Sequence, residues 1–252
     1  MYWLRIVLFS ILDSESEGSN NYIIAKYLLD HYNELPGVSL TEISRHCNLS
    51  KAAVSRFCKE LGLMDYIDLQ MLIRSSGQNK NNKTRIRPAS DDGFFEKCSE
   101  IVRNVENAIS SQPYAEELIQ DIGRYDQICT FGHLQASHIA YTLRNNLAMY
   151  NIFCFCTQLW TEQEEKIRNA SADDLIIIFS SSGDYFKRMD INMHFLDRED
   201  APRVYMVSFG EVNDTVHPKI RKISLGPVNQ NLYSNMAMNI FINYVSSRFI
   251  RG

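Results

Sequence analysis

The chain has 252 residues, 45% of them hydrophobic and 22% charged, and its formal net charge is −4. These values are typical of a soluble globular protein with one or two domains and enough length to bury a core. The six cysteines are irregularly spaced, without a C-x-x-C pair or a histidine at zinc-ligand distance. We therefore expect reduced, mostly buried thiols, and no structural metal or cofactor.

The N-terminal residues MYWLRIVLFSIL are apolar, but the stretch is too short to span a bilayer and Arg5 interrupts it. An acidic segment, SESEG, follows instead of a small-residue cleavage site, which argues against a signal peptide. We expect a helix packed on the elements that follow, no membrane contact and a cytoplasmic location. Residues 21–32 then have the periodicity of a second helix.

Two short amphipathic helices are predicted between Ser39 and Gly62, with a tight turn between them. Ser39 and Glu42 have the spacing of a capping box. Asn48 suits the turn because asparagine tolerates the left-handed conformation, and Ser50 can cap the second helix. The buried side of that helix is predicted to be Val54, Phe57, Cys58 and Leu61, with Gly62 ending the helix.

The opposite face of the second helix combines small residues with cations. Such a face can enter the major groove of DNA, where Lys and Arg reach phosphates and guanine edges. The predicted DNA-binding residues of this helix-turn-helix are Ser50, Lys51, Ala52, Ser55, Arg56 and Lys59. A helical hairpin with a solvated charged face would show the same pattern, but residues 40–90 carry a net charge of +5 and leave −9 for the remainder. This basic module in an acidic chain favours nucleic acid as its partner.

Three further parts of the chain complete the predicted organisation. A helix over residues 66–73 closes an all-α domain of residues 1–74, and the polar, basic residues 75–93 predict a linker. Beyond it, strands alternate with helices, which predicts a parallel sheet covered by helices on both faces in a domain of residues 94–252. The predicted strands are 126–131, 152–156, 174–179, 204–209 and 222–225. The predicted helices are 94–110, 113–122, 138–149, 162–168 and 232–248, with 162–165 as a solvated face.

Two loops follow strands of the predicted sheet and carry residues suited to binding an anion. In open α/β sheets, ligands bind at the carboxyl ends of the strands. Hydroxyls and backbone amides at such a turn can hold phosphate. The predicted ligand-binding residues are Gly132 and Ser137 in the first loop, and Ser180, Ser181, Ser182 and Gly183 in the second.

The segment L-S-K-A-A-V-S-R-F-C-K-E-L-G closely resembles the recognition-helix region of the RpiR family of bacterial transcriptional regulators. The more specific part is R-F-x-K-x-L-G, formed here by Arg56, Phe57, Lys59, Leu61 and Gly62. The resemblance implies an all-α helix-turn-helix head joined by a linker to an α/β sugar isomerase (SIS) domain, with a parallel five-stranded sheet flanked by helices. It also implies a double-stranded DNA operator near genes of carbohydrate uptake or metabolism, a phosphosugar effector, and a homodimer or dimer of dimers.

The two loops depart from the patterns of that family, which usually read G-x-G-x-S and S-x-S-G-x-T. The first loop here, GHLQAS, lacks the second glycine, and Ser137 lies one residue farther on. The second has Tyr185 in place of threonine. These departures leave open an SIS domain that only dimerises or binds a partner.

An enzyme, a phosphosugar isomerase or lyase, is the other alternative. It would need a general base beside the loops. His133, His138, Glu211 and His217 are conceivable bases, but none matches a catalytic motif of the family. We therefore expect a regulator with no catalytic residues.

Overall fold

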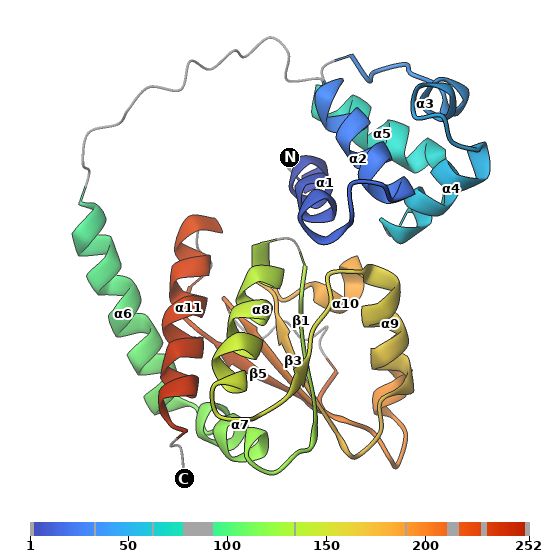
Figure 1. Ribbon diagram of the computed structural model, residues 1–252. Coiled ribbons are helices and arrows are strands. Elements are labelled where there is room, and N and C mark those ends of the chain that lie inside the picture. The colour runs from blue at the N-terminus through green and yellow to red at the C-terminus, as the bar shows by residue number, and fades with distance from the viewer. Residues whose placement is uncertain are drawn as a thin grey trace. The chain divides into compact units, whose positions relative to one another are not determined.

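The computed structural model describes residues 3–32, 34–61, 63–77, 93–133, 135–189, 191–210, 217–227 and 231–249. The chain divides into two compact units, one helical and one with a central sheet (Figure 1). Most of the predicted linker lies outside the described residues, as do Gly62, predicted to end the recognition helix, and Glu211, the conceivable base.

The helical unit contains five helices around a core of its own. They are α1 (Trp3–Ser14), α2 (Asn20–Asp30), α3 (Leu40–His46), α4 (Lys51–Glu60) and α5 (Tyr66–Gly77). Leu4 and Leu8 of α1 are fully buried in this core, which confirms that the apolar N-terminal stretch packs on the helices that follow it. Within the described ranges, no helix is long and apolar enough to cross a membrane.

The second unit is built on a five-stranded sheet in the order β2-β1-β3-β4-β5, in which all paired strands are parallel. The strands are β1 (Gln127–Gly132), β2 (Cys154–Phe155), β3 (Asp174–Phe179), β4 (Arg203–Ser208) and β5 (Ile220–Ser224). Gly132 pairs with Phe179 and Phe179 with Val207, so the carboxyl ends of β1, β3 and β4 lie at one edge. This confirms the predicted parallel sheet.

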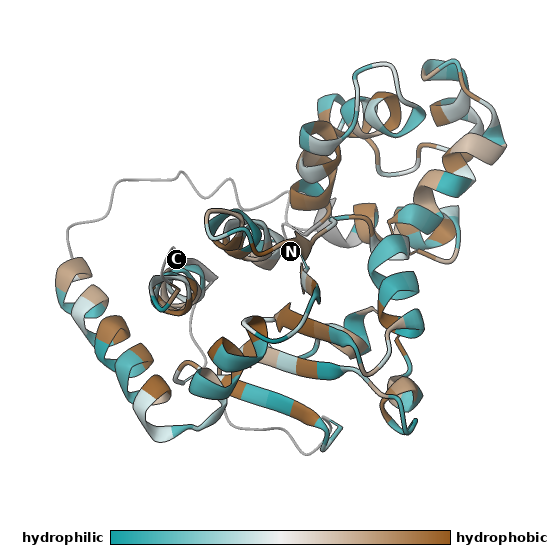
Figure 2. Ribbon diagram, turned by 60° about the horizontal axis from the view of Figure 1, so that its bottom comes forward, coloured by the Kyte–Doolittle hydropathy of each residue, from teal (hydrophilic) through white to brown (hydrophobic). Residues whose placement is uncertain are grey.

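Helices cover both faces of the sheet (Figure 1). The helices on one face are α6 (Phe94–Ser111), α7 (Tyr114–Ile122), α8 (Gln135–Ala148) and α11 (Asn231–Ser247), which share the main hydrophobic core with the sheet. The elements on the other face are α9 (Trp160–Asn169), α10 (Tyr185–Arg188) and the 3₁₀ helix η1 (Met193–Leu196). All six residues of β3 are buried, as expected of a strand covered on both sides. In Figure 2 the longer helices carry brown and teal residues on different sides, as amphipathic helices do.

In the second unit, four elements differ most clearly from the sequence prediction. β2 has two residues instead of the predicted five. It is the outermost strand and pairs with β1 at only two positions, Ile128–Cys154 and Cys129–Phe155. α8 begins at Gln135, three residues before the predicted start, and this places Ser137 inside the helix. α10 and η1 are short connecting helices of four residues each, too short to show a hydrophobic period.

Candidate functional site

Local capping fixes the starts of the two helices of the helix-turn-helix, and both N-terminal caps are formed as predicted. Glu42 N donates to Ser39 Oγ at 3.2 Å and Ser39 N donates to Glu42 Oε2 at 2.7 Å, which confirms the capping box of α3. Asn48 has φ = +54° in the turn, and Ser50 Oγ accepts from Ala53 N at 3.1 Å as the N-cap of α4. The chain therefore enters α4 in a defined direction.

The buried side of α4 is the predicted one and holds the helix firmly. Val54, Phe57, Cys58 and Leu61 are at most 5% exposed. Burial raises the pKa of the Cys58 thiol to about 12, so it remains a neutral core residue. At the end of the helix, Asn21 Nδ2 of α2 donates to Glu60 Oε2 at 2.5 Å, an anchor between two helices. Burial of one face thus fixes which face remains in solvent.

The solvent face of α4 carries the candidate DNA-binding residues. Ser50, Lys51, Ala52, Arg56 and Lys59 are exposed, and Ser55 is half-buried. The spacing of four residues between positions 51, 55 and 59 places them along one side of the helix. Arg45, an exposed cation in the last turn of α3, was not singled out from the sequence. The sequence feature that could have identified Arg45 is a basic residue one helical turn before the predicted turn at Asn48.

The first loop of the second unit is tightly packed at the end of β1. A methyl group built on Gly132 would lie 2.8 Å from the backbone N of Ser137, closer than side chains approach a backbone. Gly132 is therefore required for the first turn of α8 to lie directly against the strand end. Ser137 is only 4% exposed in that turn. The loop thus has a single glycine at its closest approach to α8, and Ser137 is a buried helix residue.

The second loop leaves β3 and turns at a glycine. Ser180 is 8% exposed, and its backbone N donates to Val207 O at 3.0 Å, which extends the pairing to β4 by one residue. Gly183 has φ = +74° and its N donates to Ser180 O at 3.1 Å, closing the turn. Ser181 is half-buried and Ser182 exposed. Because β1 and β3 are neighbours, the two candidate loops leave the same edge of the sheet.

A buried hydrogen-bond chain, Tyr185–Gln163–Gly132, links these two loops. The Tyr185 hydroxyl donates to Gln163 Oε1 at 2.5 Å, and Gln163 Nε2 donates to Thr157 O at 2.7 Å and to Gly132 O at 3.5 Å. Tyr185 is 1% and Gln163 2% exposed. The prediction that residues 162–165 form a solvated helix face is therefore wrong at Gln163. The hydroxyl of Tyr185 points into the protein and is not available at the surface of the loop.

His133, one of the conceivable bases, also lies in the first loop. Burial, and secondly the nearby guanidinium of Arg188 in α10, lowers the pKa of His133 to about 4. The imidazole is therefore neutral near pH 7, and it brings no positive charge to the loop. Arg188, by contrast, is exposed and places a cation within electrostatic reach of the first loop from the element that follows the second.

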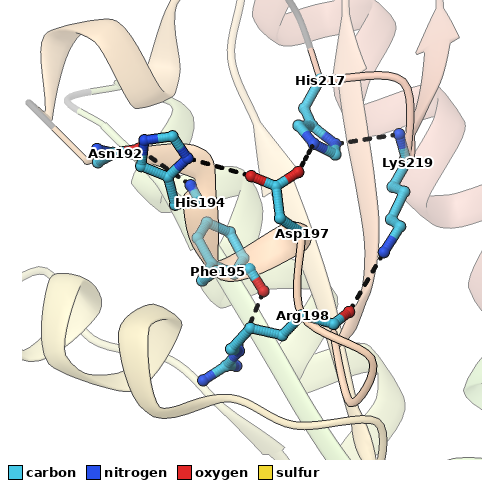
Figure 3. A network of polar contacts seen from close by, with 7 residues as sticks. All are labelled: Asn192, His194, Phe195, Asp197, Arg198, His217 and Lys219. Atoms are coloured by element: carbon cyan, nitrogen blue, oxygen red, sulfur yellow. Dashed lines mark hydrogen bonds and ion pairs between the residues drawn. The ribbon is translucent and has the colours of Figure 1, made fainter.

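His217 belongs to a different part of the domain. It precedes β5, whereas the two loops follow β1 and β3, so in a parallel sheet it lies at the opposite edge. Figure 3 shows its ring beside Asp197, with Nε2 3.0 Å from Oδ1, and His194 Nδ1 3.1 Å from the other carboxylate oxygen. Hydrogen bonds from these two histidines lower the pKa of Asp197. Across the described residues, no group of three His, Cys, Asp or Glu side chains is placed to hold a metal ion.

The fold and the capped α4 define a protein with a helix-turn-helix unit and a separate α/β unit. Residues 12–80 match the family model described as a helix-turn-helix domain of the rpiR family. The helical unit is therefore a helix-turn-helix domain of the rpiR family.

Two relatives have names that agree with this assignment. An uncharacterized HTH-type transcriptional regulator of Caldanaerobacter subterraneus subsp. tengcongensis is 26% identical over 166 residues, which are 64% of this chain. The chain spans only 59% of the length of that relative. An uncharacterized HTH-type transcriptional regulator of Providencia stuartii is 21% identical over 75% of this chain and 69% of the relative. Both are named as regulators and neither as an enzyme.

Solved structures with low sequence identity also align with the chain. The Vibrio vulnificus NanR protein complexed with ManNAc-6P aligns over 97% of this chain and 90% of its own, with 15% identity and a TM-score of 0.43. A protein of E. coli CFT073 aligns over 63% of this chain and 93% of its own, with 14% identity and a TM-score of 0.41.

Proposed function

We propose that this chain is a cytoplasmic DNA-binding transcriptional regulator of carbohydrate uptake or metabolism genes, whose α/β unit is an SIS domain that senses a phosphosugar. Residues 1–74 are the DNA-binding domain, 75–93 the linker and 94–252 the sensing domain. The observation that carries the proposal is the solvent face of α4, where three cations and three small residues stand on a helix that is capped and buried on its other side.

The proposed contact with DNA follows from the chemistry of that face. Small residues at positions 50, 52 and 55 permit close approach to base edges, while Lys51, Arg56 and Lys59 reach phosphates or guanine. A homodimer presents two copies of α4 to half-sites about one helical turn apart. A ligand of the SIS domain that favours one spacing of the two helices thereby changes operator affinity.

The proposed effector site is the pair of loops at the carboxyl edge of the sheet: Gly132 and Ser137 in the first, and Ser180 to Gly183 in the second. Three observations support this site: the common edge, the two glycines (Gly132 packed against α8, and Gly183 closing its turn), and the link through Gln163 that holds one loop relative to the other. The phosphate of a phosphosugar carries the charge that hydroxyls and backbone amides at such a strand-end turn can bind.

Catalysis is the second candidate, and the geometry gives it little support. The hydroxyl of Tyr185 is used inside the protein, and His217 lies at the far edge of the sheet. His133 is neutral near pH 7, with a pKa of about 4 that is far below that of an effective base at this pH. We therefore assign the α/β unit a sensing role and no reaction.

The test uses the purified full chain and DNA from its own promoter. We expect Arg56→Ala and Lys51→Ala each to weaken binding about tenfold, since a good base or phosphate contact is worth about 1–3 kcal/mol. Lys26→Ala removes an exposed cation from α2 and is the matched control, expected to bind like the parent. Fluorescence anisotropy at several salt concentrations measures the affinity, and circular dichroism checks the fold. Parent-like binding by both α4 variants would contradict this placement of the DNA-binding face.

The effector is tested separately by thermal unfolding against a panel of sugar phosphates and amino-sugar phosphates that includes ManNAc-6P. A ligand present at a hundred times its Kd stabilises the folded protein by about 2.7 kcal/mol, which shifts the midpoint by several degrees. If no compound of the panel shifts the unfolding midpoint, and the protein still binds its promoter, the result favours a regulator whose α/β unit only dimerises.

A further inference from the structure

Two polar side chains from β4 and β5 meet the turn of the second loop, and neither belongs to the loops themselves. A methyl group built on Gly183 would lie 3.9 Å from Nζ of Lys222 and 4.0 Å from Oγ of Ser208. Lys222 pairs with Met206, and Ser208 follows two residues later on the same strand. Since side chains two apart share a face, both point to the side of the sheet away from the main core, toward the turn.

Lys222 is an unusual residue for the interior of a strand. It is 7% exposed, and moving an ammonium group out of water costs free energy. Its desolvation lowers the pKa of the amine, while the carboxylate of Asp184 acts in the opposite direction. Its Nζ lies near the Gly183 turn, so the side chain brings an amine to the carboxyl edge of the sheet.

Ser208 adds a second, independent observation at the same place. It is 0% exposed, and its hydroxyl has no hydrogen-bond partner among the described residues. Buried hydroxyls without a partner are rare in folded proteins, because each one loses its hydrogen bonds to water. A ligand oxygen at the Gly183 turn would supply the missing partner.

We propose that Lys222 and Ser208 bind the phosphate oxygens of the effector at the Gly183 turn, Lys222 by its charge and Ser208 by its hydroxyl. This rests on the proposed function, which places a phosphosugar at the loops, and it extends that site by two residues from neighbouring strands. The ligand class is a phosphate monoester, whose oxygens can accept from an ammonium and a hydroxyl at once.

The experiment measures binding by isothermal titration calorimetry on the full chain. The probes are inorganic phosphate and the sugar phosphates of the thermal panel, each with its unphosphorylated sugar as a comparison. We expect Lys222→Met to weaken phosphate-ester binding about tenfold or more, since hydrogen bonds to charged groups are worth about 1.5–3 kcal/mol. Ser208→Ala is expected to weaken it about three- to tenfold. Lys219→Met is the control, because Lys219 precedes β5 at the opposite edge of the sheet.

The outcomes separate this inference from the proposed function. Parental affinity in both folded variants overturns the role of Lys222 and Ser208, while the phosphosugar site remains. A parent protein that binds neither inorganic phosphate nor any sugar phosphate overturns both. If Lys222→Met does not fold, Ser208→Ala decides alone, because losing a hydroxyl without a partner is not expected to lower the free energy of unfolding. Weakened binding in that variant supports the inference.

Discussion

Replacing Tyr185 with phenylalanine tests whether the two candidate loops are held together through the protein interior. The change removes only the hydroxyl that donates to Gln163 Oε1 at 2.5 Å. Both side chains are at most 2% exposed, so the amide oxygen left behind cannot recover a bond to bulk water. Loss of one partner from such a pair costs about 1–3 kcal/mol, most of it the penalty of the remaining buried acceptor. We expect the α/β unit to lose that much free energy of unfolding.

Hydrogen–deuterium exchange on the full chain is the suitable assay, because it reads each unit separately. Peptides covering β3 should exchange about 5- to 150-fold faster in Tyr185→Phe than in the parent, while those from α4 should be unchanged. Tyr114→Phe, at an exposed position of α7, is the matched control and should leave exchange within about a factor of two. Adding Gln163→Met removes the stranded amide, so the double variant should lose less than the two single losses together. Unchanged exchange of β3 in Tyr185→Phe would refute the reasoning.

Two more predictions concern the first loop. Gly132→Ala places a methyl group 2.8 Å from the backbone N of Ser137, so the start of α8 must shift, and we expect a loss of about 1–3 kcal/mol in urea unfolding. Gly123→Ala, at the end of α7, meets no atom closer than 3.5 Å and serves as its control; an equal loss in both variants would contradict the argument. The pKa of His133 is about 4 in the folded chain and about 6.5 in the unfolded one, so its neutral form favours folding above pH 6.5 and this contribution is lost as the pH falls toward 4. Proton NMR of the histidine ring should therefore show no titration of His133 between pH 7 and 5.5, and a midpoint near 6.5 would show that the imidazole is not desolvated.

The elements that sequence analysis predicted well are those whose signal is local. The capping box at Ser39, the left-handed Asn48 and the continuous apolar strand 174–179 each depend on neighbours a few residues away, and each is found as predicted. Gln163 was wrongly predicted to be solvated because it lies between glutamates in a polar stretch. Only the folded structure shows that its side chain is buried and hydrogen-bonded to Tyr185 and to Gly132 O. Lys222 was not singled out from the sequence because its position near Gly183 depends on how β5 pairs with β4 in the folded chain.

The departure of the second loop from the RpiR-family pattern has a structural cause. At position 185, a tyrosine side chain fills the space beneath the loop, and its hydroxyl reaches Gln163 in α9. A threonine there would be too short to reach that amide, so the link between the loops requires the larger residue. As a result, position 185 presents no hydroxyl at the surface of the turn. Ser208 and Lys222 lie at the turn itself, within about 4 Å of the position a Gly183 side chain would take. In this chain the buried polar groups that meet the turn therefore come from β4 and β5 and not from position 185.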